Sequence, residues 1–151
     1  MGGNSILLAQ AGARFVREFE APVSKPYSLL LDFDFPSLAA IRADGVVGSG
    51  YHAGCDGEHD SIPRMVRPDL GRVIPIHVVV REKQTGTVTL DQVFETLCKT
   101  SSSATGWNKT RTAARFHLDA GKYVIDVRNV EGQAGLDGVE TTVMLVSDGG
   151  K

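Results

Sequence analysis

The chain has 151 residues, of which 42% are hydrophobic and 23% are charged, and its formal net charge is −2 at pH 7. These values are typical of one folded domain with a real core, and they exclude a disordered chain. Nucleic-acid-binding domains usually carry a basic excess, so the slight negative charge argues against a nucleic-acid partner. No apolar run approaches the length of a transmembrane helix.

The N-terminal third predicts a terminus without regular structure, followed by two strands. Residues 1–13 are small and mixed, which is typical of a flexible N-terminus, and they lack the basic region and long apolar stretch of a signal peptide. Met1, Gly2 and Gly3 could be residues added in front of a mature, already processed chain. A signal sequence or a lipid-bearing cysteine of the precursor would then not be visible in this sequence. Residues 14–21 predict a strand that Pro22 closes. Alternation from Tyr27 predicts a second strand, which ends at Pro36, and Ser37 is expected to cap a short helical turn.

Residues 44–71 interrupt this regularity with six glycines, two prolines and many polar residues. A stretch this long without a periodic pattern is usually a functional loop or a disordered one, so we expect an irregular loop insertion. The cysteines, Cys55 and Cys98, suit one disulfide in an oxidising compartment, which would fasten this loop to the rest of the domain. Two reduced, buried thiols in a cytosolic protein are the alternative.

Apolar alternation returns after residue 72 and predicts a central strand, because valines also occupy the second face; Pro75 is unusual there, since it cannot donate to a ladder. Residues 87–96 fit a helix, in which Thr89 and Gln92 imitate a capping box, or a strand. We favour the strand. Residues 100–110 predict a polar loop that contains Trp107. The basic residues in this part of the chain are interpreted as a solvated edge: Lys99, Lys109, Arg111 and Arg115.

The most regular pattern lies between residues 114 and 130, where two alternating apolar runs flank a turn at Gly121, as expected of two half-buried strands. The spacing Asp119-x-Gly121-x-Tyr123 resembles the tyrosine corner of immunoglobulin-like sandwiches. In that corner the chain crosses between sheets and the tyrosine hydroxyl bonds backbone on the near side. Arg115 and Asp126 would then lie on different sheets, whereas a direct pair between them would indicate a simple hairpin.

Residues 139–146 supply a last strand, which makes about seven strands without any βαβ alternation. We therefore predict an all-β, immunoglobulin-like two-sheet sandwich. The single domain is expected to span residues 14–148, with residues 44–71 as a loop insertion.

Five short patterns between residues 74 and 138 form a set that can be compared with known families: Ile74-Pro75-Ile76, Val88 through Phe94-Glu95-Thr96, Leu118-x-x-Gly121-x-Tyr123, Arg128-Asn129 and Leu136-x-Gly138. They cover roughly residues 72–146. The set resembles a domain of unknown function in exported or lipid-anchored envelope proteins of Burkholderia-like Gram-negative bacteria. The resemblance implies an immunoglobulin-like fold and a location in the periplasm or outer cell envelope. It brings no catalytic residues, and the cysteine pair is not part of the shared pattern.

The strongest candidate for chemistry is the segment from Tyr51 to Asp60, which contains two imidazoles, a thiol and three carboxylates. His52, Cys55 and His59 could reach one zinc ion if the loop wrapped tightly, and a zinc site with an open position could activate water. The spacing matches no closed zinc motif, however, and a disulfide would remove Cys55 from the ligand set. We therefore interpret the segment as a polar loop, with no metal and no other cofactor.

Other polar residues carry weaker signals. Asp32 and Asp34 share one face of a strand at about 7 Å, which is compatible with the acid and base of a glycosidase. We interpret them instead as part of the solvent face of an outer strand. Trp107 and Tyr51 are the two aromatic residues that do not fall on the apolar faces of predicted strands. Two rings in separate loops are weak evidence for a sugar-binding surface. The histidines at 77 and 117 are expected at the surface.

The sequence thus favours a non-enzymatic, exported envelope protein that binds an unknown protein or surface ligand, or has a structural role, through loops 44–71 and 100–110. No catalytic residue is predicted, and a lipid anchor in the native precursor is compatible with this hypothesis. The alternative is a metal-dependent hydrolase that uses the His52–Asp60 cluster. A third hypothesis, a subunit of a larger assembly, requires an open sheet edge.

Overall fold

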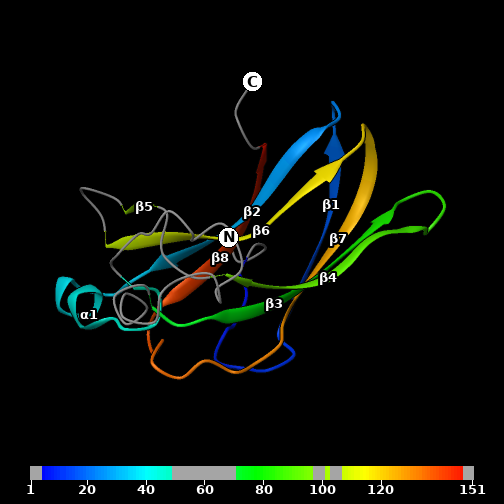
Figure 1. The fold of residues 1–151 in the computed structure, drawn as a ribbon. Coiled ribbons are helices and arrows are strands. Elements are labelled where there is room, and N and C mark those ends of the chain that lie inside the picture. Colours follow the sequence, from blue (N-terminus) through cyan, green and yellow to red (C-terminus); the bar gives the residue numbers. More distant parts are fainter. Residues whose placement is uncertain (1–4, 49–70, 97–100, 103–106, 148–151) are drawn as a thin grey trace.

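The computed structural model of the protein describes residues 5–48, 71–96, 101–102 and 107–147 (Figure 1). In this part of the chain the elements are, in order, β1 (Arg14–Ala21), β2 (Lys25–Asp34), α1 (Leu38–Ala43), β3 (Ile74–Glu82), β4 (Val88–Thr96), β5 (Ser101–Ser102), β6 (Asn108–Leu118), β7 (Gly121–Asn129) and β8 (Glu140–Ser147).

The strands form two antiparallel sheets that pack face to face, with the orders β1-β7-β3-β4 and β5-β6-β2-β8. The core lies between them, where Leu31 and Phe33 of one sheet meet the layer of Ile76, Val78 and Val127 from the other, all fully buried. The predicted all-β two-sheet sandwich is therefore confirmed. The order of its strands differs from that of an antibody domain, whose first two strands share a sheet, because here β1 and β2 belong to different sheets.

Several local predictions agree with the structure. β1 spans the predicted residues 14–21, β3 is a central strand, and residues 88–96 form the strand that we favoured over a helix. The hydroxyl of Ser37 accepts a hydrogen bond from the Ala40 N–H at 3.1 Å, so Ser37 caps α1 as expected. In the described residues, no helix is long and apolar enough to cross a membrane.

Residues 5–13 pack against the sandwich, so the prediction of a flexible N-terminus is wrong for these residues. Ile6 and Leu8 are buried, and the Ile6 N–H donates to the Thr141 carbonyl at 3.0 Å. The side-chain amide of Asn129 donates to the carbonyls of Leu8 and Gln10, both at 2.8 Å. Hydrogen bonds to residues far away in the chain hold this segment in place. Its own sequence has no periodic pattern that would predict such packing.

Two chain crossings between the sheets, β1 to β2 and β6 to β7, lie at one end of the sandwich (Figure 1), and each is a tyrosine corner. The Tyr123 hydroxyl donates to the Asp119 carbonyl at 2.7 Å, where the chain passes from β6 to β7 in the other sheet. The Tyr27 hydroxyl donates in the same way to the Val23 carbonyl at 2.9 Å, between β1 and β2. The Phe19 ring lies edge-on to Tyr27 at 5.3 Å and is the cross-strand partner of Tyr123. One aromatic cluster thus supports both crossings, which together are called the corner end.

Arg115 and Asp126 lie on β6 and β7, and therefore on different sheets, as the corner requires. The Arg115 guanidinium is within 3.4 Å of the Ser28 hydroxyl on the neighbouring strand. Asp126 pairs with Arg14 at 2.6 Å across β1 and β7. The hydrogen bond and the charges of the neighbouring arginines, chiefly Arg14, lower the pKa of Asp126.

Candidate functional site: a charged loop stem

At the opposite end of β6, two basic side chains point into the sandwich. Lys109 is 5% exposed and Arg111 is fully buried, so the interpretation of these residues as a solvated edge is wrong. The cause is a β-bulge: Leu29 pairs with Ala114 but Leu30 pairs with Thr112, which makes Ala113 an extra residue. An extra residue reverses the inside–outside alternation on the far side of the bulge. Of the other two basic residues, Lys99 lies outside the described residues and Arg115 is exposed.

Lys109 is bound to a buried carboxylate. Its ammonium donates to Asp44 Oδ2 at 2.7 Å and to the Gly48 carbonyl at 2.8 Å, and it lies 5.6 Å from the centre of the Phe35 ring. The Asp44 side chain is fully buried. It also accepts hydrogen bonds from the N–H groups of Val46, Val47 and Gly48 at 2.9 to 3.1 Å. The carboxylate therefore folds residues 44–48 into a tight turn above Lys109.

Arg111 connects this turn to the chain on the other side of segment 49–70. Its guanidinium donates to the carbonyls of Val46 and Val47 at 3.1 and 2.9 Å, and to the Arg72 carbonyl at 2.6 Å. The Arg72 N–H in turn donates to the Val46 carbonyl at 2.6 Å. Residues 44–48 and 71–72, together with the Lys109 and Arg111 side chains beneath them, are called the loop stem.

Gly71 makes the close approach of the two flanks possible. Its φ of 88° lies in the left-handed region, which side chains rarely adopt. A Cβ atom at this position would lie 2.5 Å from the Val46 carbonyl oxygen. A larger residue would therefore force the flanks of the stem apart.

Two groups of the stem, Asp44 and Arg111, have shifted pKa values. Burial alone would raise the pKa of Asp44, but the hydrogen bond from Lys109 and those from the Val46 and Val47 N–H groups outweigh burial and lower the pKa. Burial lowers the pKa of Arg111 to about 10, although the negative charge of Asp44 acts in the opposite direction. The guanidinium therefore stays protonated at neutral pH. These groups are buried and bonded to one another and to backbone, which suits them to positioning the chain.

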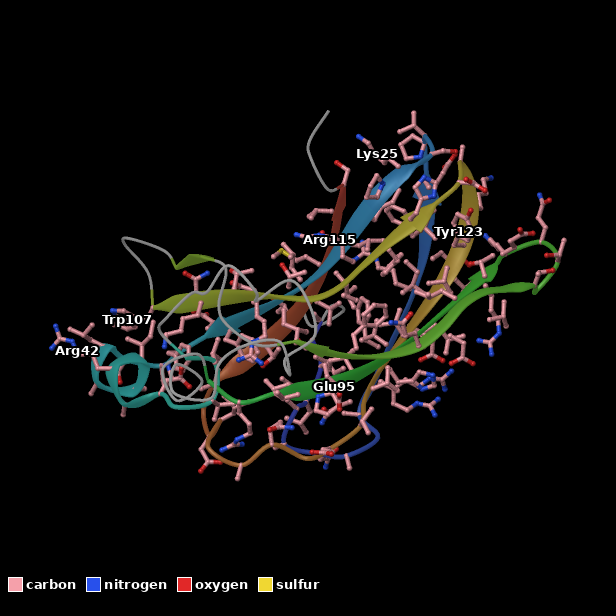
Figure 2. All side chains as sticks on the ribbon, viewed as in Figure 1. Lys25, Arg42, Glu95, Trp107, Arg115 and Tyr123 are labelled. Carbon is pink, nitrogen blue, oxygen red and sulfur yellow. The ribbon has the colours of Figure 1, made fainter. Side chains whose placement is uncertain are left out.

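The surface around the stem is exposed and includes an aromatic ring. Trp107 precedes β6 and is 46% exposed, while its carbonyl accepts a hydrogen bond from the Phe35 N–H at 2.7 Å. α1 has no buried residue. Figure 2 shows the side chain of Trp107 beside α1, which itself carries Arg42, and both lie far from Tyr123 at the corner end. A flat ring and a cation are thus available at the stem end.

The segment from Tyr51 to Asp60, with the candidate metal ligands His52, Cys55 and His59, lies outside the described residues, and so does Cys98. The zinc alternative and the Cys55–Cys98 pair therefore stay predictions. Within the described ranges, no group of three or more His, Cys, Asp or Glu side chains could hold a metal ion.

The remaining predicted polar residues lie on the outer faces of the sheets. Asp32 accepts hydrogen bonds from the Asn108 side chain at 2.8 Å and the Thr110 hydroxyl at 3.0 Å, so it links β2 to β6, whereas Asp34 is exposed. Residues 108–110 belong to β6 and not to the predicted loop. His77 pairs with Asp91 at 2.6 Å, and the His117 side chain is 57% exposed.

Sequence reasoning missed Asp44, Lys109, Arg111 and the second corner tyrosine. A signal existed for Asp44, because aspartate often accepts backbone N–H groups two residues further on in turns. A signal also existed for Tyr27, which lies four residues after its acceptor Val23, the same separation as Tyr123 and Asp119. No signal marked the two basic residues, because the bulge that turns them inward is not visible in the sequence.

These features define the class of the protein as a two-sheet antiparallel β-sandwich domain with a charged loop stem. The chain belongs to the family described as "Domain of unknown function (DUF5625)", whose model matches residues 5–147. The prediction of an uncharacterised domain family is confirmed to that extent. No curated protein matches the sequence.

Among solved structures, the chain is similar to the crystal structure of GEBA250068378 from Sulfurospirillum deleyianum, with a TM-score of 0.72 and 21% identity over 96% of this chain and 95% of that chain. This similarity shows a shared fold. A family 35 carbohydrate binding module from Clostridium thermocellum has a TM-score of 0.44 and 12% identity over 91% and 72% of the two chains. The Podospora anserina GH26-CBM35 β-(1,4)-mannanase has a TM-score of 0.38 and 13% identity over 91% and 20%. The last two similarities carry no argument about function.

Proposed function

We propose that the protein is a non-enzymatic binding module of the bacterial cell envelope, which contacts its ligand with the stem end of the sandwich. The observation that carries this proposal is the position of Arg111, whose one guanidinium bonds both flanks of segment 49–70. In sandwich domains the loops at the ends of the strands commonly carry recognition, while the sheets hold them in place.

The energetics of the stem support a positioning role. Buried ion pairs are poor stabilisers, because well-packed apolar residues of similar volume often serve stability as well or better. Asp44 and Lys109 are nonetheless paired with almost no exposure to solvent. Directional bonds to specific carbonyls define the geometry of the chain more narrowly than apolar contacts do. Fixed positions of residues 44–48 and 71–72 are what a binding surface at this end of the sandwich needs.

The same contacts argue against catalysis at the stem. Both oxygens of Asp44 accept hydrogen bonds from the protein, and the Lys109 ammonium is occupied by Asp44 and Gly48. Neither group can reach a substrate. The alternative, a metal-dependent hydrolase built on His52 to Asp60, is distinguished by elemental analysis of protein prepared without chelator. Stoichiometric zinc would overturn the non-enzymatic part of the proposal.

The location in the periplasm or outer envelope, and a lipid anchor in the native precursor, rest on the resemblance to exported envelope proteins. Fractionation of the native host with an antibody to the protein tests this location. Recovery in the cytoplasmic fraction would overturn it.

The binding surface is tested by NMR titration of the intact chain with two probes, lipopolysaccharide and soluble peptidoglycan fragments, in separate experiments. The chain has one tryptophan, so the indole N–H of Trp107 gives an unambiguous signal at the stem end. We expect one probe to shift this signal and Trp107→Ala to weaken binding. Val23→Ala is the control, because Val23 is about as exposed as Trp107 but lies at the corner end. Absence of any shift with both probes, or equal effects of the two variants, would overturn the proposed surface.

A further inference from the structure

The outer face of the β1-β7-β3-β4 sheet carries a row of basic side chains. Arg14 of β1 is the cross-strand partner of Arg128 of β7, and Arg128 is in turn the partner of His77 of β3. The row therefore crosses three neighbouring strands (Figure 1). Phe15 and Val127, the chain neighbours of the two arginines, are buried in the core, so the arginines point outward. Their side chains are 53% and 47% exposed.

Arg14 and Arg128 form a like-charge pair in which the side chains lie close together. Asn129, the next residue of β7, donates its backbone N–H to the Ala13 carbonyl and accepts the Gly12 N–H. Hydrogen-bonded and non-hydrogen-bonded pairs alternate along an antiparallel ladder, so Arg14 and Arg128 form a non-hydrogen-bonded pair, the type with the closer side chains. Like charges directly opposite each other destabilise a sheet. The chain thus carries an arrangement that by itself costs stability.

A carboxylate beneath the two arginines offsets part of this cost. Asp126, whose side chain is 8% exposed, accepts hydrogen bonds from Arg14 Nε at 3.0 Å and from Arg14 Nη2 at 2.6 Å. Its Oδ2 atom also lies 3.9 Å from Arg128 Nη2. The hydrogen bond from Arg14 lowers the pKa of Asp126, and the charges of the neighbouring arginines, which include Arg81, lower it as well. Asp126 thus faces three guanidiniums and neutralises the charge of one.

The two arginines keep donors that the protein does not use. Within the described residues, the Arg128 guanidinium makes no hydrogen bond, because 3.9 Å is too long for one. Asp126 holds Arg14 through Nε and Nη2, which leaves Nη1 outside these bonds. A group that is already held in one orientation loses less entropy on binding. His77 continues the row, but its Nε2 is bonded to Asp91 at 2.6 Å, so the arginine pair is the centre of the site.

We propose that Arg14 and Arg128 bind a phosphate monoester group, which bridges the two guanidiniums on the outer face of the sheet. Arginine forks match the oxygens of a phosphate and bond them in pairs. A phosphate monoester carries a charge of about −1.5 to −2 at pH 7, which compensates the surplus positive charge above Asp126. Both Nη2 atoms lie near the same carboxylate oxygen, so the oxygens of one phosphate can reach both side chains. Asp126 is the positioning residue of this site.

The test is an NMR titration of the intact chain with inorganic phosphate at constant ionic strength, with chloride as the reference anion. We expect saturable shifts of the Arg14 and Arg128 amide and Nε–H signals. Arg128→Gln should bind phosphate about tenfold more weakly. Arg128→Lys should lie between the variant and the natural chain, because it keeps the charge but loses the planar fork. Lys122→Gln is the matched control, since it removes an exposed charge from the same face of β7 near the corner end.

Urea unfolding separates a binding role of Arg128 from a structural one. Without phosphate, Arg128→Gln should be at least as stable as the natural chain, because it removes the like-charge pair. With phosphate, the natural chain and Lys122→Gln should gain more stability than Arg128→Gln. The proposal is overturned if phosphate causes no saturable shift, or if Arg128→Gln binds it as tightly as Lys122→Gln. A loss of stability in phosphate-free Arg128→Gln would also overturn it, since Arg128 would then serve the ion pair with Asp126.

A second arm distinguishes a soluble phosphate ester from a lipid headgroup, which share this chemistry. Phosphatidylcholine vesicles that contain phosphatidic acid are sedimented with the natural chain and with Arg128→Gln. Cosedimentation of the natural chain alone assigns the site to a lipid headgroup, whereas phosphate binding without cosedimentation assigns it to a soluble ester. Trp107→Ala should leave phosphate binding unchanged, because the row shares no residue with the stem end. Failure of the binding surface proposed there is therefore distinguishable from failure of this site.

Discussion

The two ends of the sandwich are held together by different chemistry. At the corner end, short connections cross between the sheets, and each needs one neutral hydrogen bond from a tyrosine hydroxyl to a carbonyl four residues earlier. At the stem end, the flanks of segment 49–70 meet over a buried aspartate, lysine and arginine. Closing a longer connection costs more chain entropy. The comparison teaches that a short crossing holds itself in place, whereas a long one needs side chains from another strand to hold its two flanks.

The largest expected effect comes from breaking the ion pair of the stem. Lys109→Met leaves the buried Asp44 carboxylate without its counter-ion, and removal of one partner of a buried pair costs about 3–5 kcal/mol. Urea unfolding of the variant measures this loss in the free energy of unfolding. Lys122→Met, an exposed lysine at the corner end, is the control and should change stability by less than about 0.5 kcal/mol. A loss as small as that of the control would show that the stem does not depend on its charges.

Acid should destabilise the protein less than Lys109→Met does, because a protonated Asp44 keeps part of its hydrogen bonds. The folded state lowers the pKa of Asp44. Its contribution is therefore fully present above the unfolded value of about 3.9 and is lost as the pH falls through the lower folded pKa. We expect the free energy of unfolding to fall in this range for the natural chain, and to fall less for Asp44→Asn. Equal acid profiles of the two proteins would contradict a role for the ionised carboxylate.

The corner end should show the smallest effect and the opposite pH dependence. Tyr123→Phe and Tyr27→Phe each remove one hydrogen bond, which costs about 1 kcal/mol of unfolding free energy. Burial raises the pKa of Tyr123, so its contribution is present below the unfolded value of about 10 and is lost as the pH rises through the folded pKa. Denaturant unfolding between neutral and alkaline pH measures both effects. If Tyr123→Phe loses as much stability in alkali as the natural chain, the hydroxyl is not the group that titrates.

Much of the fold was predictable, because it depends on local patterns. The alternation in β1 and β7, the cap at Ser37 and the spacing of Asp119 and Tyr123 each lie within a few residues of sequence. The candidate site was not predictable in the same way. Extrapolating the alternation of Phe116 and Ala114 places Lys109 and Arg111 outside, and only the extra residue at Ala113 turns them inward.

By itself, the sequence determined the fold class, the number of principal strands and one of the two corners. Side chains that alternate between an apolar and a polar environment can be satisfied by a two-layer sandwich and by few other structures. Only the tertiary structure decided which charges are buried and how residues 5–13 pack. These features depend on partners far apart in the chain, such as Arg111 with Val46 and Asn129 with Leu8. A one-residue bulge is sufficient to exchange the inside and the outside of a strand, and periodicity alone does not reveal it.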